Sequence, residues 1–196
     1  MIDRPGLITG DDGKARCSWS AIDDEYRRYH DDEWGVALHG DQPLFEKLSL
    51  EGFQAGLSWI TILRRRPAFR EVFHDFDIAA VASMSESDVA ELMSEPRIIR
   101  NQAKIVATIS NARLALELIT IDAGALDRLM WSFAPAPRKR PVKLADLRAV
   151  TPESTALSSA LRSRGFRFVG PTTMHALMQS TGMVDDHIDG CWRATR

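Results

Sequence analysis

The sequence predicts an all-α fold. Apolar residues recur at helical spacing over much of the chain, proline and glycine punctuate these stretches, and alternating strand patterns are nearly absent. The 196 residues suffice for one ordinary domain, and a hydrophobic content of 44% can form a buried core. We therefore expect one helical domain over residues 15–196, preceded by a flexible N-terminal extension at residues 1–14, which lack periodicity.

Two helices are expected between Leu44 and Leu63. Their apolar positions recur at helical spacing, and the glycines of EGFQAGLSW predict a tight connection at residues 52–56. A short helix is expected between the polar start at Ser85–Asp88 and Pro96, which cannot continue it. A longer helix follows, and its apolar stripe consists of Ile105, Ile109, Ala112 and Leu116.

Proline and glycine set the boundaries in the C-terminal third. The segment APAPRKRP at residues 134–141 cannot be helical and is interpreted as a linker. Thr151–Pro152 supplies a cap and a first-turn proline for a helix that ends at Gly165. Pro171 opens a further helix, which Gly182 closes.

Composition and charge exclude several classes of protein. No apolar run approaches the ~18–20 residues of a membrane helix, so no membrane span is expected. The start of the chain lacks a secretion signal, and two cysteines cannot form a disulfide framework, so we expect a cytoplasmic protein. The net charge of -2 and the pI near 6.2 argue weakly against a nucleic-acid-binding protein, which usually has a basic pI.

Four residues of metal-ligand type lie near the two ends of the chain. Cys17 and His30 are close in sequence, and His187 and Cys191 form an HxxxC pair that can hold one metal ion on a helical turn or tight loop. This set matches tetrahedral Zn²⁺ and leaves no position open for water, so the predicted site is structural and joins the two ends. The alternative is that both cysteines are ordinary core residues.

Aromatic residues make up only 8% of the chain but gather in its N-terminal part around one carboxylate, Glu51. Aromatic faces attract a cationic heteroaromatic base, and a carboxylate accepts hydrogen bonds from its exocyclic amine. The alternative is that the rings pack a core and that Glu51 is solvated. The acidic run at residues 31–33 is interpreted as a solvated turn. The candidate pocket residues are Trp19, Tyr26, Tyr29, Trp34, Glu51 and Trp59.

Positive charge is concentrated in four clusters, at residues 64–70, 97–104, 138–140 and 162–167. The second cluster, EPRIIRNQAK, lies between two expected helices. The start of the second helix there has free backbone amides, which suit a DNA phosphate. The alternative for each cluster is a solvated face.

Six motifs are spread in order over residues 17–191 and contain uncommon combinations of residues. They are RCSW (Arg16–Trp19), YHDDEWG (Tyr29–Gly35), LEGFQAGLSWITIL (Leu50–Leu63), IIRNQAKI (Ile98–Ile105), RGFRFVGPTT (Arg164–Thr173) and MVDDHIDGC (Met183–Cys191). Together they resemble the 3-methyladenine DNA glycosylase I family, a branch of the helix-hairpin-helix DNA glycosylases. The resemblance implies that fold, with the hairpin inside residues 44–135.

The resemblance also places the functional residues of the family on this chain. The ligands of one structural Zn²⁺ fall on the four Cys and His residues named above, and the pocket aromatics fall on the five rings. The base-binding carboxylate falls on Glu51, which we expect to be catalytic. Gly56–Leu57 is similar to the element that fills the gap left by a flipped nucleotide. The hairpin about Ile98–Arg100, followed by Lys104, is similar to the phosphate-binding turn.

Two features depart from the family pattern. Arg97 stands where the hairpin of the family often has a glycine, and the insert at residues 134–141, like the extension before Arg16, is unlike compact members. Neither the insert nor the extension is expected to touch the pocket.

The implied activity is base-excision repair of double-stranded DNA. A flipped 3-methyladenine is released by hydrolysis of its N-glycosidic bond. The Asp that many helix-hairpin-helix glycosylases carry after the hairpin is absent from this family, and no replacement is evident near Thr172–Thr173, so we expect a monofunctional enzyme without a Lys nucleophile. We expect a monomer. The alternative is a non-catalytic, zinc-containing domain that binds damaged DNA, and a zinc hydrolase is disfavoured because the predicted metal shell is full.

Overall fold

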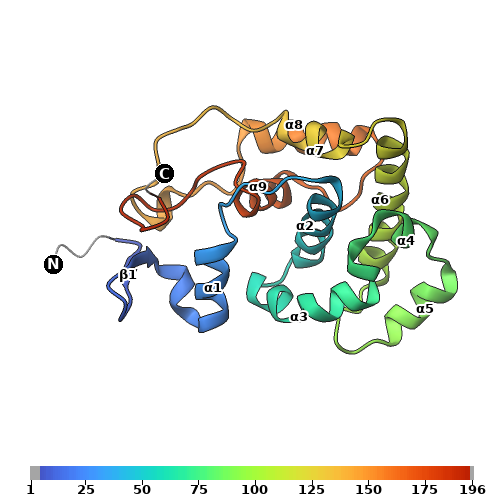
Figure 1. The fold of residues 1–196 in the computed structure, drawn as a ribbon, viewed down its shortest axis with the longest axis horizontal. Coiled ribbons are helices and arrows are strands. Elements are labelled where there is room, and N and C mark those ends of the chain that lie inside the picture. The colour runs from blue at the N-terminus through green and yellow to red at the C-terminus, as the bar shows by residue number, and fades with distance from the viewer. Residues whose placement is uncertain (1–4, 195–196) are drawn as a thin grey trace.

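Helices make up most of the structure, which confirms the all-α prediction (Figure 1). The computed structural model describes residues 5–194. The α-helices are α1 (Asp24–Asp32), α2 (Asp41–Gln54), α3 (Trp59–Val72), α4 (Ile78–Ser83), α5 (Glu86–Ser94), α6 (Gln102–Ile121), α7 (Ala125–Trp131), α8 (Pro152–Ser163) and α9 (Pro171–Ser180). Single turns of 3₁₀ helix lie at η2 (His74–Phe76) and η3 (Leu144–Asp146), and a slightly longer one is η1 (Ser18–Ile22).

The N-terminal extension, which the sequence analysis expects to be flexible, contains a short strand. Strand β1 (Leu7–Thr9) pairs antiparallel with β2 (Ala15–Cys17), with Leu7 opposite Cys17. Arg16 fixes this hairpin because its guanidinium binds both Asp12 and Asp31 at 2.7 Å. Three-residue strands are too short for an alternating pattern to be recognised, which is why the sequence missed them. Residues 1–4 of the extension lie outside the described part of the chain.

The connection between α2 and α3 lies at residues 55–58, slightly later than predicted. Gly52 remains inside α2, where a Cβ atom would stand 3.4 Å from that of Phe168. Gly56 is the residue that breaks the helix pair, since its φ of +85° is in the left-handed region that favours glycine. The glycine at position 52 thus serves close packing, and the one at position 56 serves the turn.

The later helices lie where the sequence predicts them. Helix α6 begins after Asn101, whose side chain accepts the N–H of Lys104 at 3.1 Å and caps the helix. Helices α8 and α9 each begin at a proline, and residues 134–141 are not helical. The prediction missed α1, α4 and α7, all short helices whose sequences carry no long apolar stripe.

Helix α2 lies at the centre of the core. Its residues from Leu44 to Phe53 are almost all buried, because α9, α3, α6 and α7 pack around it. Helix α8 packs on α9, and α4 packs on α6 (Figure 1). The N- and C-terminal segments meet at the left-hand end of the view, where a second small apolar cluster forms from Cys17, Ile188, Cys191 and Ala194. Within residues 5–194, no helix combines the length and the apolar character needed to cross a membrane.

The cap of α8 provides a test of this fold. Thr151 is buried and its hydroxyl accepts the N–H of Ser154 at 3.1 Å. We expect Thr151→Ala to lower the free energy of unfolding by about 1–2 kcal/mol, as measured by urea denaturation, because the cap is lost. Ser163→Ala is the control, since that exposed hydroxyl bonds only to the carbonyl of Ala160. Equal stability of the two variants would contradict the role of the cap.

Candidate functional site

A pocket of about 210 Å³ opens between α1, α2, α9 and the start of α3. This volume lies below the ~300–1,000 Å³ typical of pockets for drug-sized ligands, so it suits one small planar molecule. All six pocket residues predicted from the sequence line it: Trp19, Tyr26, Tyr29, Trp34, Glu51 and Trp59.

The rings of the pocket pack against one another at right angles or in tilted pairs. Trp19 contacts Tyr26 at a centroid distance of 5.5 Å and Trp34 at 5.1 Å, both edge to face. Tyr29 lies 5.4 Å from Trp59 on the opposite side. Tyr29, Trp34 and Trp59 are buried, which holds their faces in fixed positions. Such preformed aromatic walls attract a flat cation.

Glu51 is the buried carboxylate of this pocket. Its Oε1 accepts a hydrogen bond from the hydroxyl of Ser180 at 3.1 Å, while Oε2 has no hydrogen-bond partner among the described residues. Burial raises the pKa of Glu51 to about 7, although Lys47 and Ser180 partly oppose that rise. The Nε1 atom of Trp59 is also buried without a partner in the described chain. Unsatisfied buried polar atoms are costly, so these two indicate a ligand that supplies the missing bonds.

Lys47 lies one turn before Glu51 on α2 and is 7% exposed. Its ammonium is 4.9 Å from the ring centroid of Tyr29 and 5.5 Å from that of Trp59. Burial lowers the pKa of Lys47, and the neighbouring Glu33 and Glu51 oppose that shift. Burial also raises the pKa of Tyr29 well above its ordinary value, with Glu51 adding to the effect. Lys47 is therefore a counter-charge beneath the pocket that the sequence analysis missed.

Five further lining residues were also missed. Gln54 lies one turn after Glu51 on α2, so its position on the same helix face was a usable signal. The others come from distant segments, and only the tertiary structure brings them here. They are Leu147, Ala176, Gln179 and Ser180.

Three of the four predicted metal ligands form one buried cluster. The ligand atoms of Cys17, His30 and Cys191 lie within 4.8 Å of one another, and these residues could hold a metal ion. The Nδ1 atom of His30 is 2.9 Å from a carboxylate oxygen of Asp31, so its Nε2 atom faces Cys191 Sγ at 3.4 Å. Carboxylates behind the histidine are typical of metal sites. A hydrogen bond from the Cys17 thiol lowers the pKa of Cys191 to about 4, which favours the thiolate that metals bind.

His187, the fourth predicted ligand, lies beside this cluster. Its ring centroid is 5.1 Å from that of His30, and its Nδ1 atom is 3.0 Å from Asp185. Its buried Nε2 atom has no hydrogen-bond partner among the described residues, so the lone pair of this nitrogen is available to a metal ion. Gly35 makes room for the ring, because a Cβ atom there would lie 2.6 Å from His187 Cε1. The donor set and its surroundings therefore fit a bound metal ion.

The predicted DNA-contacting residues divide into exposed and buried groups. Leu57 is 41% exposed at the tip of the loop that follows Gly56, and Arg100 is exposed on the turn before α6. Ile98 is buried, so its side chain anchors this turn and only its backbone can face a phosphate.

The sequence predicts that Lys104 contacts DNA directly, but the structure buries this side chain. Its side chain is 8% exposed, and its ammonium donates to the carbonyls of Phe53 at 2.8 Å and Ala55 at 2.7 Å. A cation at the C-terminal end of a helix satisfies carbonyls that have no partner within the helix. Lys104 thus fixes the end of α2 and, with it, the loop that carries Leu57.

Some arginines of the first three predicted basic clusters are neutralised within the protein, whereas those of the fourth, at residues 162–167, are exposed. Arg64, Arg66 and Arg70 bind carboxylates of Asp23, Glu33 and Glu46, so the first cluster and part of the acidic run compensate each other. Arg97 binds Glu71 and Glu95 at 2.7 and 2.8 Å. In the hairpin cluster, Arg100 is the cation that forms no ion pair within residues 5–194 and faces solvent.

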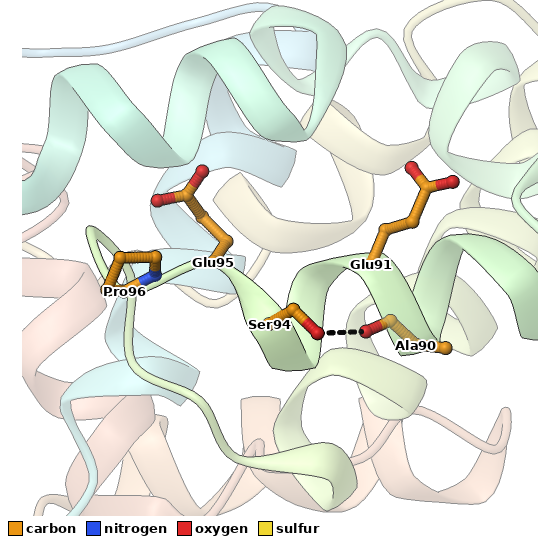
Figure 2. A pocket seen from close by; sticks show the side chains of 5 residues that line it. All are labelled: Ala90, Glu91, Ser94, Glu95 and Pro96. Atoms are coloured by element: carbon orange, nitrogen blue, oxygen red, sulfur yellow. Dashed lines mark hydrogen bonds between the residues drawn. The ribbon is translucent and has the colours of Figure 1, made fainter.

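A larger hollow of about 530 Å³ lies on the surface at the end of α5, but its chemistry differs. Figure 2 shows its lining side chains, among which Glu91 and Glu95 extend from the helix and the loop after it and Ser94 bonds to the carbonyl of Ala90. No aromatic ring and no cation lines this hollow within the described chain. It suits neither a heteroaromatic base nor a phosphate, so the aromatic pocket is the candidate site.

Known proteins are similar to this chain over most of its length. The model of the methyladenine glycosylase family matches residues 19–194. DNA-3-methyladenine glycosylase 1 of Escherichia coli (strain K12) is 44% identical over 178 residues, which cover 90% of this chain and 95% of that protein. DNA-3-methyladenine glycosylase of Haemophilus influenzae is 44% identical over 181 residues, with 90% and 96% covered. A solved structure of 3-methyladenine DNA glycosylase I from Staphylococcus aureus is also similar, with a TM-score of 0.85 and 32% sequence identity. The match covers 92% of this chain and 97% of that one, and that structure is described as the structural basis of 3-methyladenine recognition.

The buried carboxyl of the pocket predicts how stability depends on pH. Because the pKa of Glu51 is raised to about 7, the folded chain holds this proton more tightly than the unfolded chain, whose pKa is near 4.5. The stabilisation from the protonated form is therefore complete below pH ~4.5 and is lost as pH rises to ~7, by about 3 kcal/mol in total. We expect Glu51→Gln to lack this loss in urea denaturation at a series of pH values. Exposed Glu91→Gln is the control, and parallel curves for wild type and Glu51→Gln would contradict the prediction.

Proposed function

This chain belongs to the methyladenine glycosylase family, and we propose that it releases 3-methyladenine from alkylated double-stranded DNA. The reaction is hydrolysis of the N-glycosidic bond, as the glycosylase names of its relatives state for those proteins. The observation that carries the proposal is the buried Glu51 carboxylate, with one oxygen unsatisfied, inside a box of aromatic rings. A non-catalytic damage-binding domain is not favoured, since the close relatives are enzymes.

The pocket selects the damaged base by its charge. A 3-methylated adenine in DNA is cationic, so the faces of Trp59 and Tyr29 attract it, whereas neutral adenine gains little from them. Glu51 accepts hydrogen bonds from the adenine edge, and a cation in the pocket stabilises the ionised carboxylate. Neutral adenine adds no positive charge to that of Lys47 beside this buried carboxylate, so it stabilises the ionised form less.

The base must leave the duplex to reach the pocket. Flipping costs a few kcal/mol of lost stacking and pairing. Leu57, half-exposed on the loop that Lys104 holds, is positioned to fill the gap left in the duplex. The exposed Arg100 and the backbone amides at the start of α6 bind the phosphates of the same strand.

Bond cleavage then needs little further chemical assistance. The positive charge of the base already weakens the glycosidic bond, and the base leaves as a neutral molecule. Glu51 is the one carboxylate among the described residues that line the pocket. Orientation of the base by Glu51 and the rings therefore carries the reaction, with water as the final nucleophile. The enzyme is monofunctional because Lys104 is occupied by carbonyls and Lys47 lies beneath the rings, away from the pocket lining.

The metal cluster has a structural role in this proposal. Cys17, His30, His187 and Cys191 hold one Zn²⁺, whose contribution is to tie the two ends of the chain together. The segment that follows Cys17 carries Trp19, and α1 carries Tyr26 and Tyr29, so this tie steadies one wall of the pocket. We expect the protein to act as a monomer, in a reducing compartment such as the cytoplasm, where both thiols remain available for the metal.

The decisive test of function is base release. We expect wild-type protein to release free 3-methyladenine from methylated duplex DNA, detected by chromatography, and Glu51→Ala to lose about 10- to 100-fold in kcat/KM because a charge-assisted hydrogen bond is lost. Exposed Glu91→Ala is the control and should match wild type. Borohydride should trap no covalent adduct with DNA. Release at the wild-type rate by Glu51→Ala would contradict the role of this carboxylate.

Metal content tests the structural site. We expect wild-type protein to contain about one Zn²⁺ per chain by atomic emission, and Cys191→Ser and His187→Ala to hold less and to melt at lower temperature. His39→Ala is the control, since His39 is 59% exposed and pairs with Asp127. Wild-type protein that takes up no Zn²⁺, or a His187→Ala variant with unchanged affinity, would contradict the four-ligand site.

A further inference from the structure

The segment between α7 and α8, residues 134–150, is termed the strap. In Figure 1 it leaves α7 and crosses the top of the molecule to the end where the two termini meet. Its backbone is tied there, because the N–H of Asp189 donates to the carbonyl of Pro141 at 2.8 Å. Arg138 binds Asp186 at 2.8 Å and Arg140 binds Asp185. The strap is therefore anchored beside the metal cluster.

The strap reaches the base pocket through Leu147, which follows the insert at residues 134–141; no residue of the insert itself lines the pocket. Leu147 lines the pocket together with the aromatic rings. A compact turn presents it: Asp146 accepts the backbone N–H groups of Val142 and Lys143 at 3.1 Å, and the N–H of Leu147 donates to Leu144 at 3.1 Å. Its neighbour Arg148 is exposed. Leu147 thus lines the base pocket, while its sequence neighbours Asp146 and Arg148 line a separate surface hollow.

The strap carries the positive charge that the hairpin lacks. A surface hollow of about 310 Å³ is lined by four cations (Arg138, Lys139, Arg140 and Arg148) and by the carboxylates of Asp146 and Asp186. Arg138 and Arg140 are compensated by their carboxylate partners. Lys139, Lys143 and Arg148 are exposed and form no ion pair within residues 5–194. The strap therefore offers three exposed cations without an ion pair among the described residues, although Arg148 is near enough to Glu153 to lower the pKa of that carboxyl, whereas the hairpin offers one.

We propose that the strap is a second DNA-contacting surface, on which Lys139, Lys143 and Arg148 bind backbone phosphates that flank the flipped nucleotide. This inference rests on the proposed function. A flipped nucleotide stays attached to its neighbours, so its phosphates lie at the mouth of the pocket that holds its base. Leu147 forms part of that mouth, and consecutive Cα atoms are ~3.8 Å apart, so Arg148 lies within reach of these phosphates. The surface recognises the DNA backbone and carries no base preference of its own.

Salt dependence of binding tests this surface. The variant is Lys139→Gln/Lys143→Gln/Arg148→Gln, and the probe is a fluorescent duplex with a tetrahydrofuran abasic site, measured by anisotropy over a series of KCl concentrations. Each phosphate contact contributes about 0.9 to the slope of log K against log salt. We expect the slope to fall by about two to three units and the affinity to fall roughly tenfold to a hundredfold. Because all three residues are exposed, the melting temperature should not change.

A matched triple variant provides the control. Arg162→Gln/Arg164→Gln/Arg167→Gln removes the same charge from exposed positions at the far end of α8 and should keep a slope close to that of wild type. An unchanged slope in the strap variant, or an equal fall in both triple variants, would overturn the proposal. Base release by wild type is measured in parallel. Failure of release would refute the proposed function, whereas the slope decides separately whether the strap contacts DNA.

Discussion

Burial of the Glu51 carboxylate at the centre of the molecule is the constraint on which the rest of the structure depends. A carboxylate without solvent is unfavourable unless its oxygens are satisfied, and one oxygen of Glu51 has only the hydroxyl of Ser180. The surrounding core is strong enough to hold it there, because α2 is enclosed by helices on all sides. Under the proposed function, a cationic base in the pocket would stabilise the ionised form of this buried carboxyl.

The two ends of the chain complete the pocket that α2 begins. The N-terminal part of the chain, from the end of β2 to the residues just after α1, supplies four of the aromatic rings, and α9 supplies Gln179 and Ser180. Cys17 and His30 come from the first group of elements, and His187 and Cys191 follow α9 directly. Each donor pair is therefore adjacent in sequence to one wall of the pocket. A metal ion between them would limit how far the walls can separate, which links a structural site to recognition without any step of chemistry at the metal.

The local distribution of charge, rather than the net charge, determines which surfaces of this protein can bind DNA. The net charge of -2 conceals an uneven distribution, since some arginines, such as Arg66 and Arg97, bind neighbouring carboxylates and others are exposed. Arg97 illustrates the effect, because two glutamates neutralise it on the hairpin where a phosphate was expected. Lys104 illustrates another, since its ammonium serves the end of α2. Several exposed cations remain without an ion pair among the described residues, and those of the strap are close in sequence to Leu147, which lines the pocket.

The sequence by itself determined the helical class, the positions of α5, α6, α8 and α9, the aromatic set and Glu51, because periodicity, capping residues and uncommon motifs are local properties of the chain. It also identified the four residues of metal-ligand type by their chemistry. Only the tertiary structure decided that Lys104 is buried, that Arg97 is neutralised and that Leu147 reaches the pocket. These outcomes depend on which distant groups become neighbours, and neither charge nor hydropathy along the chain records that. Whether a charged side chain is exposed, paired or buried depends on its neighbours in the folded chain, so only the tertiary structure shows it.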